Sequence, residues 1–166
     1  MQITIQKEVK KSWALFLGIG TMMIAHGLQL QVMGIRSVVE NFNVVTTGIF
    51  MSGYYVGYFL GSHTTPKLVQ KVGHIRVFAA FASLASLSAL VAAVYVNPFM
   101  WTLSRFITGI SLVSCYVVTE SWLNDRATNK NRGQLLSTYM IILYFGLAIG
   151  MLLLNLSDPK NYEPFI

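Results

Sequence analysis

Long apolar segments alternate with short polar ones along this chain. A helix needs about 20 consecutive apolar residues to cross the hydrocarbon core of a bilayer. Five segments have this character, at approximately Trp13–Gly34, Val44–Gly61, Val77–Val96, Phe99–Thr119 and Leu135–Leu156. Five such runs at this spacing are typical of a polytopic membrane protein, not of buried helices in a soluble core. The pattern predicts an all-α fold, a polytopic membrane helical bundle with five transmembrane helices.

Composition supports lipid as the solvent of these segments. Of the 166 residues, 54% are hydrophobic and only 11% are charged, whereas soluble domains carry about 25% charged residues. The mean hydropathy is +0.57. A soluble core of this size cannot bury so much apolar surface. Cys115 is the single cysteine, so no disulfide forms within the chain.

The net charge of +6 is explained by membrane topology rather than by a nucleic-acid partner. Nucleic-acid binders gather Lys and Arg on one exposed face, but here the cations lie in alternate gaps between apolar segments. Most fall on one predicted side: Lys7, Lys10, Lys11, Lys67, Lys71, Arg76, Arg126, Lys130 and Arg132. Only Arg36 and Lys160 fall on the other. The positive-inside rule makes the cation-rich side, with the amino terminus, cytoplasmic.

The basic stretch Gly61–Arg76 is then a cytoplasmic link between the second and third spans, and we expect Pro66 and Gly73 to break the helices on either side of it. At the other end of the sequence, the segment DPKNYEPFI has the look of the start of a sixth helix. We therefore expect a fragment or a truncated gene product.

Arg105 lies inside the fourth apolar span, where a charge costs a few kcal/mol. One interpretation is that its side chain reaches back to the outer surface. The functional interpretation is that it faces an aqueous cavity and meets an anion, a carboxylate or a proton-coupling group. Gly109 follows one turn later, and we expect the missing side chain there to clear space beside the guanidinium.

His26 and Gln29 share one face of the first span, because they are three residues apart. Histidine changes charge near neutral pH, so His26 can relay a proton or contact a solute; a hydrogen-bonded packing role is the equal alternative. Tyr116 and Tyr139 are further candidates for a cavity wall, although most membrane tyrosines are interfacial or packing residues.

Glu120 closes the predicted fourth span at the cytoplasmic rim. It can pair there with Arg132, or with Lys71 and Arg76, and an exposed pair is worth only about 0–1 kcal/mol. A pair this weak forms and breaks easily, which suits a gate latch. The alternative is a solvated carboxylate.

Soluble-enzyme chemistry has little support in the sequence. There is no P-loop, no GxGxxG and no HExxH motif. The histidines, His26, His63 and His74, lie in separate segments without metal-ligand spacing. We expect no enzyme activity, no metal and no cofactor.

Several of these stretches resemble the Major Facilitator Superfamily. Pro66–Arg76 resembles the family signature between helices two and three through its basic residue, glycine and trailing arginine, with Pro66 and Gln70 in place of the usual glycine and acid. RFITG, Arg105–Gly109, resembles the fourth-helix arginine–glycine motif. Glu120 with Arg132-Gly133 resembles the link between helices four and five. The stretches GIRSVVENF, VGHIRVFA and YVVTESWLNDRATNKNRGQLLSTYM look most like the YcaD-like bacterial branch.

The resemblance implies a twelve-helix transporter of two six-helix halves, with a solute site near the midplane and rocking of the halves. This chain would be the amino-terminal domain over residues 1–166, incomplete before or within helix six, in a bacterial inner membrane. The implied partners are the bilayer, a small-molecule solute, and the missing carboxyl-terminal half or a second copy.

The implied function is secondary active transport, with proton coupling left open. His26, Gln29, Arg105, Gly109, Tyr116 and Tyr139 would line the pathway. The cytoplasmic gate would be formed by Lys67, Gln70, Lys71, Gly73, Arg76, Glu120 and Arg132. The alternative is a truncated, non-transporting membrane module or assembly subunit.

Overall fold

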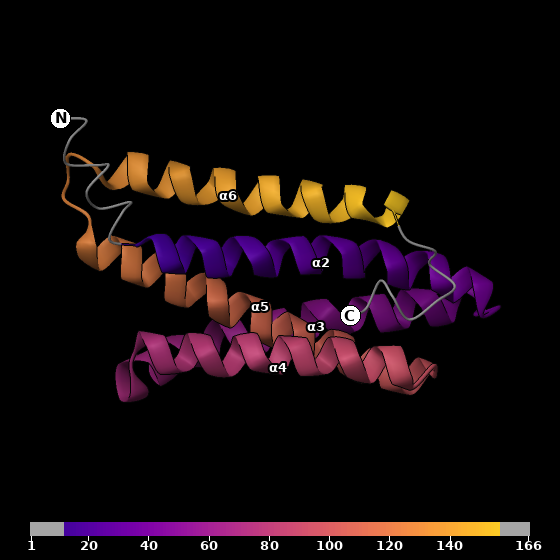
Figure 1. Cartoon of the computed structure of the whole chain (residues 1–166). Coiled ribbons are helices and arrows are strands. Elements are labelled where there is room, and N and C mark those ends of the chain that lie inside the picture. The colour runs from indigo at the N-terminus through magenta and orange to yellow at the C-terminus, as the bar shows by residue number, and fades with distance from the viewer. Residues whose placement is uncertain (1–11, 157–166) are drawn as a thin grey trace.

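Five long helices make up nearly all of residues 12–156, the part of the chain that the computed structural model describes (Figure 1). They are α2 (Trp13–Val39), α3 (Val44–Val72), α4 (His74–Val94), α5 (Pro98–Arg126) and α6 (Arg132–Leu153), and a short 3-10 turn, Leu154–Leu156, follows α6. No strand occurs between residues 12 and 156. The predicted all-α bundle is confirmed.

Four of these helices, α2, α4, α5 and α6, are long and apolar enough to cross a membrane. The remaining expected span corresponds to α3. Of the five described helices, α3 is the one that is not apolar enough to count as a membrane-spanning helix by composition. Threonines near its start and His63, Lys67 and Lys71 toward its end dilute its apolar residues. At about 1.5 Å per residue, 29 residues extend about 44 Å, which exceeds the roughly 30 Å hydrocarbon core.

The stretch Gly61–Arg76 differs from the expected loop. Helix α3 runs through Pro66 to Val72, so the prediction that Pro66 breaks the helix is wrong. Proline removes one backbone donor, and hydroxyl side chains in its neighbourhood bond to the preceding turn, as Thr65 does to the Gly61 carbonyl at 2.7 Å. Gly73 does separate α3 from α4, and its φ of 86° is one that glycine adopts readily.

Helix α5 also runs further than expected, to Arg126. Glu120 therefore lies within the helix and does not close it. The extension is held by packing, because Leu123 is fully buried in a cluster with Leu135 and Tyr139 of α6. The expected sixth-helix start and the amino-terminal lysines lie outside the described residues.

Close backbone contact defines two helix pairs, α3 with α5 and α2 with α6. A Cβ on Gly57 of α3 would overlap the Phe106 carbonyl of α5, and one on Gly109 of α5 would overlap the Tyr54 carbonyl of α3. The same reciprocal relation joins the second pair: Gly27 faces the Leu147 carbonyl, and Gly150 faces the Ile24 carbonyl. Small residues permit this approach in lipid, where packing rather than the hydrophobic effect holds helices together.

Helix α4 packs on the other side of α5, whereas contacts between the α2–α6 pair and the rest of the bundle are sparse (Figure 1). Two apolar clusters join the groups. The outer cluster contains Val32, Met33, Phe50, Ala92, Ala93 and Trp101. The inner cluster contains Phe16, Ile19, Cys115, Leu123, Leu135 and Tyr139. Between these two clusters lies the middle of α2, at His26.

Candidate functional site

Arg105 lies in the amino-terminal half of α5 and is buried, with only 3% of its surface exposed. Its guanidinium carbon lies 4.9 Å from the centre of the Tyr54 ring on α3, in a cation–π contact. Its Nε and Nη1 atoms are enclosed and have no hydrogen-bond partner among the described residues. An arginine that reached back to the outer surface would be exposed, so the burial supports the interior placement.

Tyr54 links Arg105 to His26. The imidazole of His26 stacks on the Tyr54 ring, with centroids 5.6 Å apart and planes 18° from parallel. Side chains from α2, α3 and α5 thus form one row, His26–Tyr54–Arg105. The Nδ1 atom of His26 is enclosed and has no partner in the described part of the chain. Three helices therefore contribute polar side chains to one place in the apolar bundle.

Gly109 acts differently from the expected clearing of space. The Tyr54 backbone occupies the position that a Gly109 side chain would take. The space left by the missing side chain is therefore filled, and the expectation that Gly109 clears room is wrong. The glycine instead brings the α3 backbone against α5, and this approach sets the Tyr54 ring beside Arg105, one turn away from Gly109.

Gln29 lies next to His26 on α2 and is 8% exposed. Its Nε2 atom is enclosed without a partner among residues 12–156. Both side chains line a groove of about 550 Å³ between α2, α4 and α5, with Thr108 on its far wall. The remaining walls are largely apolar, with Leu17, Met22 and Phe78 among them. The groove therefore has a polar end at the level of the His26–Tyr54–Arg105 row.

Tyr116 and Tyr139 lie between this row and the end of the bundle at which α5 is connected to α6. The Tyr116 hydroxyl donates to the Met23 sulfur at 3.1 Å, and Tyr116 packs against the cluster that contains Tyr139. Tyr139 is fully buried and donates to Glu120 at 3.4 Å. The two tyrosines therefore belong to one packed region of α2, α5 and α6, which extends to Glu120.

The expected gate residues do not form one contact network in this conformation. Glu120 accepts from Tyr139, while Arg132 donates through Nε to Asn124 at 2.7 Å. Within residues 12–156 the ion pairs are Arg36–Glu40 and His74–Asp125, so Glu120 pairs with none of the described cations. The side chains of Lys67, Gln70, Lys71 and Arg76 are exposed, as is Gly73.

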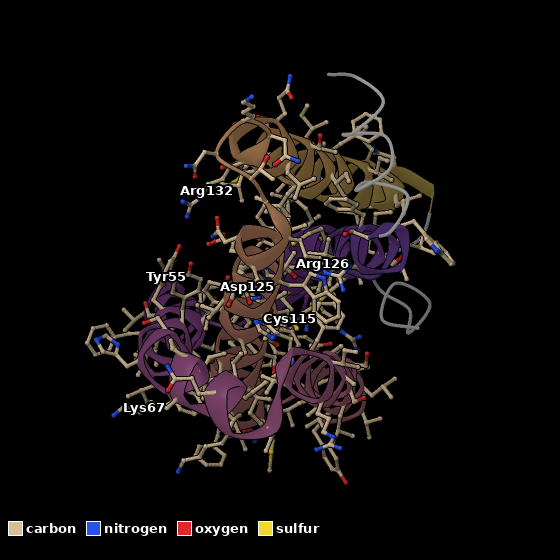
Figure 2. All side chains as sticks on the ribbon, turned by 90° about the vertical axis from the view of Figure 1, so that its left-hand side faces the viewer. Tyr55, Lys67, Cys115, Asp125, Arg126 and Arg132 are labelled. Carbon is tan, nitrogen blue, oxygen red and sulfur yellow. The ribbon has the colours of Figure 1, made fainter. Side chains whose placement is uncertain are left out.

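The end of the bundle that carries the α3–α4 and α5–α6 connections faces the viewer in Figure 2, with Lys67, Asp125, Arg126 and Arg132 labelled, and it has contacts that the sequence did not suggest. The His74 Nε2 atom lies 3.0 Å from the Ser121 hydroxyl. Trp122 packs edge-on against the His74 ring and carries the Arg126 guanidinium 4.8 Å above its own ring. These contacts tie the end of α5 to the start of α4.

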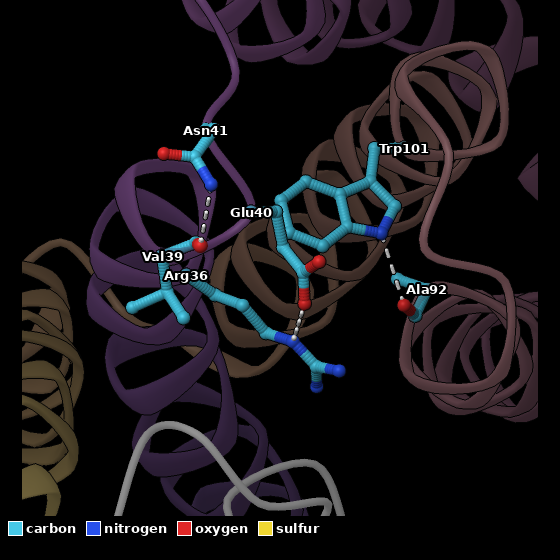
Figure 3. A network of polar contacts seen from close by, with 6 residues as sticks. All are labelled: Arg36, Val39, Glu40, Asn41, Ala92 and Trp101. Atoms are coloured by element: carbon cyan, nitrogen blue, oxygen red, sulfur yellow. Dashed lines mark hydrogen bonds and ion pairs between the residues drawn. The ribbon is translucent and has the colours of Figure 1, made fainter.

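The outer end is fixed by a second polar network, drawn in Figure 3. Arg36 pairs with Glu40 at 3.3 Å. The Trp101 indole donates to the Ala92 carbonyl at 3.0 Å and packs against Phe42 and Phe50. Trp101 thereby connects α5 to the end of α4. It is also part of the outer apolar cluster, which lies between the Arg105 row and this end of the bundle.

Tyr54 is the central residue that sequence reasoning missed. It lies in a helix with further tyrosines at Tyr55 and Tyr58, one to four residues away. This group of tyrosines, with Gly57 in the same turn, was the feature of the sequence that could have indicated an aromatic contact. The group did not show which tyrosine ring faces Arg105, because the choice of ring depends on how α3 packs against α5.

These features define a polytopic membrane protein with a polar site between two apolar clusters. The family model of the Major Facilitator Superfamily matches residues 15–156. The chain therefore belongs to the Major Facilitator Superfamily.

Relatives of similar sequence are bacterial membrane transporters by name. An uncharacterized MFS-type transporter of Enterobacter sp. (strain 638) is 31% identical over 116 residues, which cover 70% of this chain and 30% of the relative. The uncharacterized MFS-type transporter YcaD of Salmonella newport (strain SL254) is 32% identical over 108 residues, 65% of this chain and 28% of the relative. The chain thus spans less than a third of these relatives. No solved structure matches the chain.

Proposed function

We propose that this chain is part of a secondary active transporter that moves a small solute across the bacterial inner membrane by alternating access. The observation that carries the proposal is the His26–Tyr54–Arg105 row, in which Arg105 is buried and the other two side chains are half-buried. It lies between an outer and an inner apolar cluster. Ionisable side chains inside membrane helices are rare and commonly mark a solute or proton path.

The apolar clusters are suited to the two ends of such a path. A solute at Arg105 would be separated from the outer side by Trp101 and its aromatic neighbours, and from the cytoplasm by Tyr139 and its cluster. Rocking of helix groups that share few contacts would open one end at a time. The sparse packing between the α2–α6 pair and the α3–α4–α5 group favours movement of this kind.

We assign the cytoplasmic latch to Glu120, Arg132 and the basic residues near Gly73 in another conformation of the cycle. Glu120 here bonds only to a tyrosine hydroxyl at 3.4 Å, and Arg132 is exposed. Both are free to exchange these weak bonds for a charge pair as α5 and α6 move. A non-transporting membrane module needs no such exchange.

The complete transport path requires helices beyond those described. The groove lined by His26 and Gln29 lies along α2, between α2, α4 and α5. We propose that another helix of the same transporter covers this groove. A second six-helix half, or a second copy of the chain, would then close the path on the remaining side.

Transport by the full-length polypeptide in proteoliposomes tests the proposal. Uptake of labelled lactate, alanine, glucose and choline is measured with and without an imposed pH gradient. We expect uptake of at least one solute above protein-free liposomes. A stimulation by the gradient would establish proton coupling, and its absence would remove that part of the proposal.

Arg105→Ala is expected to abolish this uptake while membrane insertion stays intact, and Lys130→Gln, an exposed change outside the proposed path, is the control. Unchanged uptake by Arg105→Ala would remove Arg105 from the mechanism. Uptake of none of the four solutes by the wild type would favour the non-transporting module.

A further inference from the structure

Arg105 is a buried cation without a counter-charge in the described part of the protein. The carboxylates there are Glu40, Glu120 and Asp125. Glu40 pairs with Arg36 and Glu120 bonds to Tyr139. None of the three lies within the 4.0 Å ion-pair distance of Arg105. The aromatic ring in contact with its guanidinium is that of Tyr54.

A cation–π contact compensates only part of the lost hydration. The ring attracts the positive charge, but it supplies less than the hydrogen bonds to water that a buried, unpaired guanidinium has lost. The contact supplies no oxygen acceptor for the N–H donors, which lie in the guanidinium plane. Nε and Nη1 carry three of the five N–H donors and have no acceptor among residues 12–156. The missing component is an oxyanion in the guanidinium plane.

We propose that Arg105 binds the anionic group of the transported solute, and that this solute is a small organic anion bearing a carboxylate or a phosphate-type group. Both groups match the planar fork of arginine donors. The inference rests on the proposed transport function and names the substrate class of the same site.

Tyr54 is the positioning residue of this site. Its ring contacts the Arg105 guanidinium and also stacks with the His26 ring, so it joins side chains from α2 and α5. Gly109 allows the α3 backbone to come close enough for this arrangement. His26 and Gln29 add the enclosed Nδ1 and Nε2 atoms on the α2 side. They can contact the remainder of the solute.

Binding to the detergent-solubilised full-length polypeptide tests the inference independently of transport. The probes share one ring and differ in charge: benzoate, phenylphosphonate, neutral benzamide and cationic benzylamine. Isothermal titration calorimetry is expected to show saturable binding of at least one anionic probe and binding at least about tenfold weaker for the neutral and cationic ones, because a charge-assisted hydrogen bond is lost. The benzoate and phenylphosphonate arms decide between the two anionic groups.

Variants of the site test the assigned roles. Arg105→Gln is expected to weaken anion binding by about 10- to 100-fold, and Arg105→Lys less, since it keeps the charge but loses the planar fork. Tyr54→Leu is expected to weaken binding several-fold, and Tyr54→Phe, which keeps the ring, to restore it to near the wild-type level. Recovery with Phe separates positioning of the guanidinium from general loss of structure.

Arg126→Gln is the matched control, because Arg126 also lies on an aromatic ring but at the cytoplasmic end of the same helix. It is expected to leave anion binding unchanged. Three results would overturn the inference: no saturable binding of either anion at millimolar concentration, equal binding of benzamide, or full anion binding by Arg105→Gln.

The outcomes for the solute class and for transport can be told apart. Uptake of glucose or choline without anion binding would refute the anionic substrate and leave the transporter standing. Saturable anion binding with no uptake of any solute would refute transport and retain an anion-binding membrane module.

Discussion

Trp101 is the largest fully buried side chain among the described residues. Its indole N–H donates a hydrogen bond to the Ala92 carbonyl near the end of α4 (Figure 3). The last carbonyls of a helix lack intrahelical donors, and the indole supplies one to Ala92. Trp101→Phe is expected to lower the free energy of unfolding by about 1–2 kcal/mol, through the lost hydrogen bond. Trp101→Ala should lower it by about 3–5 kcal/mol, because a cavity is added.

Thermal unfolding of the full-length polypeptide in detergent, followed by circular dichroism, measures both effects of the Trp101 changes. The control is Trp13→Phe, since Trp13 is 63% exposed in the bundle and packs weakly. Equal unfolding midpoints for Trp101→Phe and wild type would show that the indole hydrogen bond contributes nothing to stability.

Single residues that carry charge were easy to predict from the sequence, and their partners were not. Arg105 and His26 stand out because they interrupt apolar runs in which polar side chains are expensive. Tyr54 does not interrupt its run, since tyrosine is common in membrane helices. Its role depends on the α3–α5 contact, which places its ring between the two ionisable side chains.

At the level of helices, pairing depends on glycines rather than on apolar faces. Gly57→Ala would place a methyl group on the Phe106 carbonyl and force α3 away from α5. A loss of about 1–3 kcal/mol is expected, as for other overpacked sites, together with weaker anion binding as Tyr54 moves away from Arg105. Gly48→Ala is the control on the same helix, because nothing lies within 4 Å of the added methyl group. The same thermal unfolding and calorimetric assays measure both changes, and a Gly57→Ala protein as stable as Gly48→Ala would contradict the packing role.

Helix existence followed from hydropathy, whereas helix ends and neighbours did not. Pro66 and Glu120 looked like boundaries, yet both lie inside helices that extend past the apolar segments. Hydropathy reports where lipid surrounds a segment, and a helix continues beyond that point wherever packing supports it. The neighbours were equally hidden, because lipid tails are as apolar as the side chains and give no preference for a partner.

The whole bundle repeats one arrangement twice. The α3–α5 pair and the α2–α6 pair use glycines in the same reciprocal positions, which is the relation expected of structural repeats in a transporter. The polar row lies where the two pairs meet, so neither pair forms it alone. A solute held there would contact both, and its binding energy would act directly on their relative position. This coupling would be the physical basis of the proposed transport by movement of the pairs.

The charge distribution of the bundle makes a final prediction about its orientation. The connections at the end that bears Lys67, Arg126 and Arg132 are strongly basic (Figure 2), whereas Arg36 at the opposite end is paired with Glu40. The positive-inside rule places the basic end in the cytoplasm. A membrane-impermeant maleimide added to intact cells should therefore label Val44→Cys, at an exposed outer position, and leave Lys130→Cys unlabelled.

Inverted membrane vesicles should give the opposite labelling pattern. The native Cys115 is fully buried and supplies a low background for both variants. Labelling of Lys130→Cys in intact cells would place the basic end outside. The Glu120–Arg132 latch would then control the outer side of the path, and Trp101 would lie on the cytoplasmic side of Arg105. The sidedness of every proposed gate follows from this one measurement, because the order of the clusters along the helices is fixed by the fold.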